Sequence, residues 1–423
     1  MFLSERFHRL FKEGFWIITG QVMMVLGSLA SVRLLTELLT PAAYGELALG
    51  MTIATLVSQL IIGPLGGGIT RFYAPAIEYG DLAGYLNAAR KLVLFATGII
   101  VLITIFVAVG LIVTGHSKWT GIAEIAFLFA LLNGYNAILS GIQSAARQRA
   151  IVALHQGVEP WLRLFVAAGL LLWLGETSTV AMLGYAIATL LVLGSQVLFF
   201  RKIISINIPI SIRKNWQGDI WKFSWPLGFW GIFTCMQLAS DRWSLQFFSS
   251  TGEVGSYAVL YQLGYYPISL LTGMAMQFLL PILYQRAGDA SNSIRNADTN
   301  KLSWQLTWLS LGLTGVAFFV AIMLHHQIFQ ILVAKEYRTI SYLLPWMVFA
   351  GGVFASGQTL ATNLQAQMKT REMIGAKIIT AVLGITLNFA GAYWYGITGV
   401  VCAGVVYSML YFFWMVGLVT SRQ

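Results

Sequence analysis

Residues 92–113 read LVLFATGIIVLITIFVAVGLIV, a nearly continuous apolar run without a charged side chain. A helix needs about 20 such residues to cross the hydrocarbon core of a bilayer, which is roughly 30 Å thick. The segment therefore predicts a membrane-spanning helix. Comparable runs predict twelve spans, at residues 15–36, 44–66, 88–113, 120–141, 151–174, 179–200, 220–246, 255–280, 304–324, 341–365, 373–394 and 397–419.

The composition of the whole chain agrees with this interpretation. Of the 423 residues, 57% are hydrophobic and 10% are charged, whereas a soluble domain carries about 25% charged residues. The 42 glycines suit close helix packing in lipid, and the sequence lacks the alternating strands of an outer-membrane barrel. Cys235 and Cys402 lie inside apolar runs and are interpreted as small core residues. An all-α integral membrane protein is predicted.

The basic residues predict the topology. An even number of spans places both termini on one side of the membrane. Nineteen of the 26 Lys and Arg residues lie in segments on that side, whereas the opposite loops hold only Lys118, Lys335 and Arg338. The positive-inside rule therefore places both termini in the cytoplasm, and the net charge of +10 needs no nucleic-acid partner. No cleavage site follows the first apolar run, so we expect that span to be retained.

A central polar connection, residues 201–219, divides the predicted spans into six and six. We therefore expect an N-terminal six-helix lobe at 1–205, a cytoplasmic linker at 206–218 and a C-terminal six-helix lobe at 219–423. A weak repeat supports two halves: Ser31-Val32-Arg33 precedes Tyr44-Gly45, and Ser240-Asp241-Arg242 precedes Val254-Gly255 at nearly the same spacing. Parallel repeats of this kind predict a substrate path in the cleft between the halves.

Arg163 is the leading candidate for a binding residue. A charge at membrane depth is costly, so an ionisable residue inside a span is a functional candidate by default. Arg163 lies about 18 Å along the fifth span, near the midplane. Pro160 should kink the helix close to it. The alternative is a structural ion pair with Glu159, four residues earlier on the same helical face.

Two further arginines occupy equivalent places in the two halves. Arg33 and Arg242 are expected near the periplasmic ends of the first and seventh spans. Either side chain could instead extend to the membrane interface, or pair with Glu37 and Asp241 respectively.

Polar residues at other positions complete the candidate set. Arg71 follows Gly66-Gly67-Gly68 at the cytoplasmic end of the second span, where it is either a binding residue or a topological anchor. Amides inside the spans could line an aqueous cavity or bond neighbouring helices. They are Gln21, Gln59, Asn133, Asn136, Gln237, Gln262, Asn363 and Asn388.

Several classes of chemistry have no support in the sequence. The five histidines lack the spacing of a helical metal pair, so no metal site is expected. There is no Walker A glycine loop, no nucleophile motif and no clear pair of catalytic carboxylates. We expect neither an enzyme nor a cofactor, and transport must be driven by a gradient or by the concentration of the substrate.

The run from Val32 to Gly45, VRLLTELLTPAAYG, together with Arg71, resembles the polysaccharide-transporter family of oligosaccharide flippases. This Wzx-like group belongs to the multidrug/oligosaccharidyl-lipid/polysaccharide exporter superfamily. The resemblance implies a MATE-like fold with two six-helix lobes around a cationic cavity in the bacterial inner membrane. It also implies that an undecaprenyl-diphosphate-linked oligosaccharide moves to the periplasmic leaflet for O-antigen or exopolysaccharide synthesis.

In that interpretation Arg163 holds the diphosphate at mid-depth, Arg33 and Arg242 attract or release it, and Arg71 receives it from the cytoplasm. Guanidinium groups suit this role because they bind phosphate oxygens bidentately and remain charged. Gln21 is grouped with these binding residues as a partner for sugar hydroxyls. The expected partners are the lipid-linked sugar, the bilayer and the polymerase and export machinery, with no nucleic acid.

Other functions remain open at this point. An exporter of drugs or organic cations would favour carboxylates in its cavity, and Asp241 and Glu159 are the candidates for ion coupling. A flippase for the peptidoglycan precursor typically has two more spans at its C-terminus. A membrane glycosyltransferase or polymerase needs a sizeable soluble domain, and the longest loops here have about 20 residues.

Overall fold

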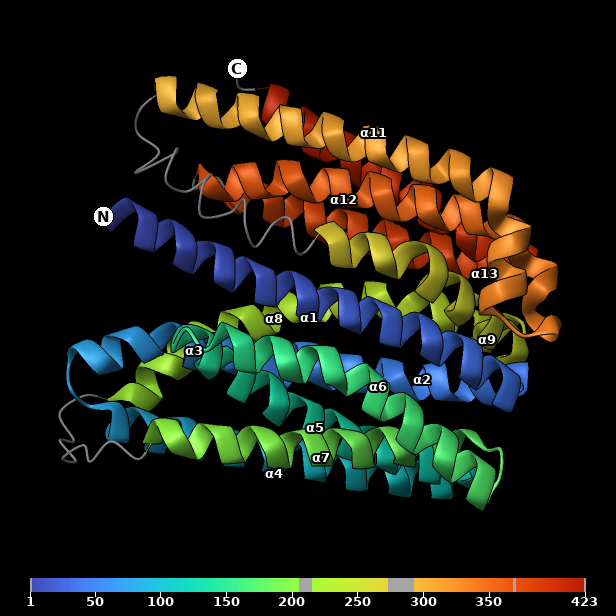
Figure 1. The fold of residues 1–423 in the computed structure, drawn as a ribbon. Helices are drawn as coiled ribbons and strands as arrows, with labels where there is room; N and C mark the ends of the chain where they lie inside the picture. The colour runs from blue at the N-terminus through green and yellow to red at the C-terminus, as the bar shows by residue number, and fades with distance from the viewer. Residues whose placement is uncertain (1, 205–214, 273–292, 368–369, 422–423) are drawn as a thin grey trace. The chain divides into compact units, whose positions relative to one another are not determined.

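The computed structural model describes residues 2–204, 215–272, 293–367 and 370–421, and within these ranges the chain is almost entirely helical, with no strand (Figure 1). The α-helices are α1 Phe2–Leu38, α2 Pro41–Val57, α3 Gly63–Glu78, α4 Leu82–Val113, α5 Thr120–Ala145, α6 Arg149–Leu174, α7 Ser178–Ile204, α8 Trp216–Phe248, α9 Thr251–Leu260, α11 Ser293–Leu332, α12 Leu344–Ala366 and α13 Thr370–Thr420. The shorter turns are η1 Ser58–Ile62, η2 Ser117–Trp119, η3 Tyr261–Tyr265 and η4 Lys335–Leu343.

The predicted multi-pass membrane architecture is confirmed. Nine helical stretches of the described chain are long and apolar enough to cross a bilayer. All twelve predicted spans fall on helices, although the span at 255–280 can be followed only to residue 272. The last two spans lie within α13, which turns sharply at Gly396 with φ +56°. Such a positive φ favours glycine because a Cβ would be strained there.

The second helix of each half carries a π-helical turn that the sequence analysis did not predict. One turn, η1, joins α2 to α3, and the other, η3, follows α9. In each, the residue after the turn donates its N–H to the carbonyl of the turn's first residue. Pro64 and Pro267 come directly afterwards. Because proline cannot donate the next helical hydrogen bond, it favours a local irregularity of this kind.

The chain packs as two compact units. Unit 1 comprises Met1–Leu39 and Glu46–Cys235, and unit 2 comprises Thr40–Gly45 and Met236–Gln423. In unit 1, α1 packs on α6, and α7 packs on both α5 and α6; in unit 2, α12 packs between α11 and α13. Two continuous helices, α2 and α8, contribute residues to both units. The lobe boundary at 206–218 stays a prediction, since most of that linker lies outside the described residues.

The first half of α8 is held firmly in unit 1. Trp216, which is buried, donates its indole N–H to Asp81 Oδ2 at 2.8 Å. Further along α8, a Cβ built on Gly231 would lie only 2.7 Å from the carbonyl oxygen of Gln59 in η1. The glycine therefore permits close packing of α8 against the π turn.

Candidate functional site

Arg163 lies on α6 within a polar cluster of unit 1. Its Nη2 donates to Asn133 Oδ1 on α5 at 2.9 Å, and its Nε donates to Thr189 Oγ1 on α7 at 3.3 Å. The same Nη2 forms an ion pair with Glu159 Oε1, one turn earlier on α6. The side chains of Arg163 and Glu159 are 19% and 17% exposed. The ion pair between Arg163 and Glu159, which was the alternative to a binding role for Arg163, is therefore present.

Aromatic rings support the same guanidinium. The Arg163 Cζ lies 4.7 Å from the ring centroid of Phe129 and 6.0 Å from that of Tyr185. A guanidinium over an aromatic face gains electrostatic attraction from the ring quadrupole. Arg163 is thus fixed in direction by three helices and neutralised by a single carboxylate. An anionic ligand could bind Arg163 by displacing Glu159, or it could share the guanidinium with Glu159.

The neighbouring amides of unit 1 connect helices. Asn136 Nδ2 donates to the Thr189 carbonyl at 3.1 Å, and Gln196 Nε2 donates to Ser140 Oγ at 2.9 Å. Asn133, one of the predicted amides, instead contacts Arg163 directly. Asn136 therefore bonds a neighbouring helix, which was one of the two interpretations of these amides. Asn133 instead contacts the candidate binding residue, Arg163.

Arg33 lies near the end of α1 and is less completely satisfied. Its Nη2 is 2.5 Å from Glu37 Oε1, with the two side chains 37% and 46% exposed. Its Nη1 atom is buried without a hydrogen-bond partner among the described residues. A guanidinium with an unused N–H can donate to a further acceptor oxygen, such as one from phosphate.

Arg242 lies on α8 in a closed cluster of unit 2. Its Nη1 is 3.7 Å from Asp241 Oδ1, and its Cζ is 4.7 Å from the ring centroid of Tyr261. Asp241 is buried and also accepts hydrogen bonds from the Tyr257 hydroxyl at 2.8 Å and from the Arg242 backbone N–H at 2.7 Å. The carboxylate is thus held by two hydrogen bonds and by an ion pair with the Arg242 guanidinium.

Tyr257 and Tyr261 were missed by the sequence analysis. Their spacing of four residues places both rings on one face of α9 and η3, and Tyr265 continues the series. The rings of Tyr261 and Tyr265 are stacked with centroids 5.0 Å apart. This repeated tyrosine spacing was the available signal.

The two remaining candidates stand apart from these clusters. Arg71 is exposed on α3. Gln21 is half-buried on α1, and its Oε1 is buried without a hydrogen-bond partner in the part of the chain that the structure describes. Neither is drawn into the Arg163 cluster by a hydrogen bond or an ion pair within the described ranges.

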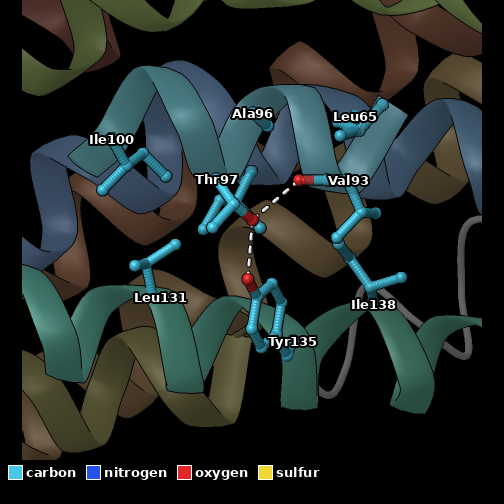
Figure 2. A pocket seen from close by; sticks show the side chains of 9 residues that line it. Leu65, Val93, Ala96, Thr97, Ile100, Leu131, Tyr135 and Ile138 are labelled. Atoms are coloured by element: carbon cyan, nitrogen blue, oxygen red, sulfur yellow. Dashed lines mark hydrogen bonds between the residues drawn. The ribbon is translucent and has the colours of Figure 1, made fainter. Parts of the chain in front are cut away.

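The described residues contain no group of three or more His, Cys, Asp or Glu side chains placed to hold a metal ion. An apolar cavity of about 10 Å³ lies between α3, α4 and α5, near η1, and the hydroxyls of Thr97 and Tyr135 on its lining are 2.6 Å apart. Figure 2 shows the side chains that line it. A single water needs about 10–15 Å³. This cavity therefore cannot hold a sugar or a lipid headgroup.

Comparison with known families gives one match over most of the chain. A family model described as a polysaccharide biosynthesis protein matches residues 10–286. A search of curated proteins finds no match for this chain.

Solved structures with the same fold cover nearly the whole chain. An inward-facing multidrug resistance MATE family transporter of the MOP superfamily has 14% identity and a TM-score of 0.71, covering 95% of each chain. The lipid II flippase MurJ, in an inward closed conformation, has 13% identity and a TM-score of 0.71, covering 97% of this chain and 87% of that chain. A MOP superfamily transporter from Pyrococcus furiosus has 13% identity and a TM-score of 0.64, covering 98% and 96%. The predicted MATE-like fold is confirmed.

Proposed function

Because the chain belongs to the polysaccharide biosynthesis protein family, we propose that it is a flippase for a lipid-linked oligosaccharide. The substrate would be an undecaprenyl-diphosphate-linked repeat unit that moves from the cytoplasmic to the periplasmic leaflet by alternating access. Its product would feed the synthesis of O-antigen or an exopolysaccharide, next to the polymerase and export machinery.

The observation that carries this proposal is the environment of Arg163. A permanently charged guanidinium stands inside a membrane-spanning helix, and one carboxylate from the same helix balances it. A diphosphate carries more negative charge than one carboxylate and offers several oxygens to the guanidinium fork. It can therefore compete with Glu159 for Arg163. An organic cation would gain nothing from this arginine.

The other arginines would supply a route on either side of Arg163. Arg33 offers an unsatisfied donor near the end of α1, and exposed Arg71 lies on α3. By the positive-inside rule, Arg71 would lie at the cytoplasmic side and Arg33 at the periplasmic side of the inner membrane. Arg71 would receive the diphosphate, and Arg33 and Arg242 would attract or release it. Gln21 would bond sugar hydroxyls.

The driving force would come from an ion gradient or from the substrate's own gradient. Asp241 and Glu159 would couple an ion to this movement; each is paired with an arginine inside a helix. No cofactor enters the proposal, and the chain would act as a transporter and not as an enzyme.

The test is complementation of a deletion strain, with membrane levels of the protein measured in parallel. The wild-type chain is expected to restore surface polysaccharide and to remove accumulated lipid-linked repeat units, whereas Arg163→Ala should do neither. Unchanged lipid-linked intermediates in the deletion strain, combined with increased sensitivity to cationic drugs, would instead support a drug exporter.

A further inference from the structure

Helices α5, α6 and α7 of unit 1 share an internal polar face. On α6, His155, Glu159 and Arg163 recur at every fourth residue, so they lie along one side of the helix. One side of α5 carries polar residues at spacings of three and four. They are Asn133, Asn136, Ser140 and Gln143. Because α7 packs on both of these helices, the polar residues of all three can meet inside the unit.

Two levels of hydrogen bonds connect the helices across this face. At mid-depth, Arg163 bonds to residues of α5 and α7, as described above. About two turns further along α7, Gln196 Nε2 donates to Ser140 Oγ on α5 at 2.9 Å. The preceding residue of α7, Ser195, has its hydroxyl oxygen 3.0 Å from His155 Nε2 on α6. On the proposed topology this second level lies nearer the cytoplasm.

Buried amides on this face lack the partners that such groups need. Gln143 is fully buried, and neither its amide nitrogen nor its amide oxygen has a hydrogen-bond partner among the described residues. The same is true, in that part of the chain, of the side-chain oxygens of Asn136, Gln148 and Gln196. Buried polar atoms are nearly always bonded to protein or to ordered water. Gln143 needs both an acceptor and a donor, which water supplies and a metal cation does not.

His155 can hold a proton in this setting without losing either of its hydrogen bonds. Its Nδ1 lies 2.8 Å from the carbonyl oxygen of Ile151, which can only accept, so Nδ1 carries a hydrogen. Its Nε2 faces the hydroxyl of Ser195. A hydroxyl can donate to a neutral imidazole or accept from a charged one. The buried ring can therefore gain and lose a proton at Nε2 without moving.

One carboxylate stands close to this histidine. Glu159 is one helical turn away on the same face of α6. Among the described side chains of the helices that pack on α6, α1 has no titratable group from Gly14 to Val32. The Tyr135 hydroxyl of α5 bonds to α4 instead. On α7, Tyr185 lies against the Arg163 guanidinium and Arg201 follows near the end of the helix. Glu159 is thus the acceptor for a proton that leaves the ring.

We infer that ordered water bonds the buried amides and forms a path from the cytoplasmic end of α5 to Glu159, along which His155 relays protons. The inference rests on the proposed function, and it makes the coupling ion at Glu159 a proton. In the uptake step, water gives a proton to the Ser195 oxygen while the hydroxyl proton of Ser195 moves to His155 Nε2. In the release step, the Nε2–H bond breaks, and through water an O–H bond forms on the Glu159 carboxylate. Neutral Glu159 then no longer balances the charge of Arg163.

Hydrogen–deuterium exchange at the imidazole C2 position, followed by mass spectrometry of the purified protein, tests whether water reaches His155. This exchange needs water at the ring, so a dry buried histidine is protected. His155 is only 5% exposed, but we expect its rate to lie within about tenfold of that of exposed His116. A slower rate for His155 would overturn the water path.

Gln143→Leu tests the same path by removing the amide while keeping a side chain of similar size. It should slow exchange at His155 by about tenfold or more and leave His116 unchanged, because leucine cannot bond the water. If Gln143 has no water, the leucine variant should instead raise the unfolding temperature, because an unbonded buried amide is lost. A higher unfolding temperature with unchanged exchange at His155 would contradict the inference.

His155→Gln tests the relay, because an amide can bond both Ile151 and Ser195 but cannot carry the proton. Flipping is measured in proteoliposomes with a fluorescent undecaprenyl-diphosphate-linked sugar. The wild-type rate should depend on pH between about 5 and 8, where a histidine titrates. The variant should flip about tenfold more slowly or less, without that dependence, whereas the matched control His116→Gln should behave as the wild type.

A rate in His155→Gln with the wild-type size and pH dependence would overturn the relay. If the wild-type chain flips no lipid at all, the proposed function fails instead. Exchange at His155 in the same protein still reports on the water path in that case, so the two failures can be told apart.

Discussion

Arg33 and Arg242 occupy equivalent places in the two halves of the sequence, but the structure surrounds them differently. Arg33 is 37% exposed, meets Glu37 on the following turn and keeps one unsatisfied donor. Arg242 is 15% exposed and lies against the ring of Tyr261, beside a carboxylate that Tyr257 also holds. The repeat has thus preserved the residue type while its surroundings diverged.

This difference separates two uses of a membrane arginine. A guanidinium whose partners are all protein groups fixes helices to one another, whereas one with a spare donor can bind a ligand. Arg163 is intermediate, since it is well supported but balanced by only one carboxylate. The comparison therefore predicts a large effect on stability for Arg242 in addition to its proposed part in transport, an effect mainly on transport for Arg33, and effects on both for Arg163.

The largest expected effect is on stability, in Arg242→Ala. Removal of one partner from a buried ion pair typically costs about 3–5 kcal/mol, because the other charge is left uncompensated. The variant should lower the unfolding temperature of the purified protein in detergent, and Asp241→Asn with Arg242→Gln should recover part of the loss. If Arg242→Ala unfolds at the same temperature as Arg33→Ala, the distinction between the two arginines is wrong.

The second effect concerns Arg163 and its carboxylate. Arg163→Ala should weaken binding of the lipid diphosphate by about 1.5–3 kcal/mol, the worth of hydrogen bonds to a charged group. That corresponds to roughly tenfold to a hundredfold in affinity. Glu159→Gln should strengthen the same binding, because it removes the competing carboxylate. Binding is measured with a fluorescent undecaprenyl diphosphate in detergent micelles.

A double-mutant cycle decides between binding and purely structural pairing. If Arg163 serves only to neutralise Glu159, the double variant Arg163→Gln with Glu159→Gln should restore both stability and flipping. If Arg163 binds the substrate, the double variant should regain stability but remain inactive. Recovery of flipping in the double variant would remove Arg163 from the mechanism.

The fold was predictable because each span carries its own signal. Long apolar runs and the distribution of Lys and Arg are local properties, and each of the twelve predicted spans fell on a helix as far as the described residues reach. The two π turns were harder to predict: Pro64 and Pro267 mark where regular bonding must fail, but not which irregularity replaces it. Gly396 was likewise visible as a glycine, but its positive φ was not.

The predictable members of the site were the charged residues and one amide, Asn133. Arg163 with Glu159, and Arg33 with Glu37, are four residues apart, so one helical turn was enough to pair them. The tyrosines around Asp241 come from another helix, and the contact of Gly45 with Gly255 joins segments some 210 residues apart in sequence. Such tertiary contacts join distant parts of the chain and leave no local sequence pattern. They therefore cannot be predicted from a single sequence.

A smaller change in stability tests how Asp241 is held. Tyr257→Phe removes the hydroxyl that donates to Asp241 and keeps the ring. The net loss of one hydrogen bond should cost about 0.5–1.5 kcal/mol, well below the effect of Arg242→Ala. Thermal unfolding in detergent measures it. Tyr342→Phe is the control, because its exposed hydroxyl contacts Thr398 near the surface of unit 2. A loss equal to that of the control would show that the hydroxyl does not support the carboxylate.

The smallest stability effect is expected for Arg33, where it distinguishes ligand binding from packing. Exposed ion pairs contribute about 0–1 kcal/mol, so Arg33→Ala should barely change the unfolding temperature. Its flipping rate should nevertheless fall, since the unused Nη1 donor is lost together with the charge. Arg33→Lys is the matched variant, because it keeps the charge but not the planar fork. If lysine sustains full flipping, Arg33 provides only a positive potential. If lysine fails as alanine does, bidentate contact with phosphate oxygens is the function of this side chain.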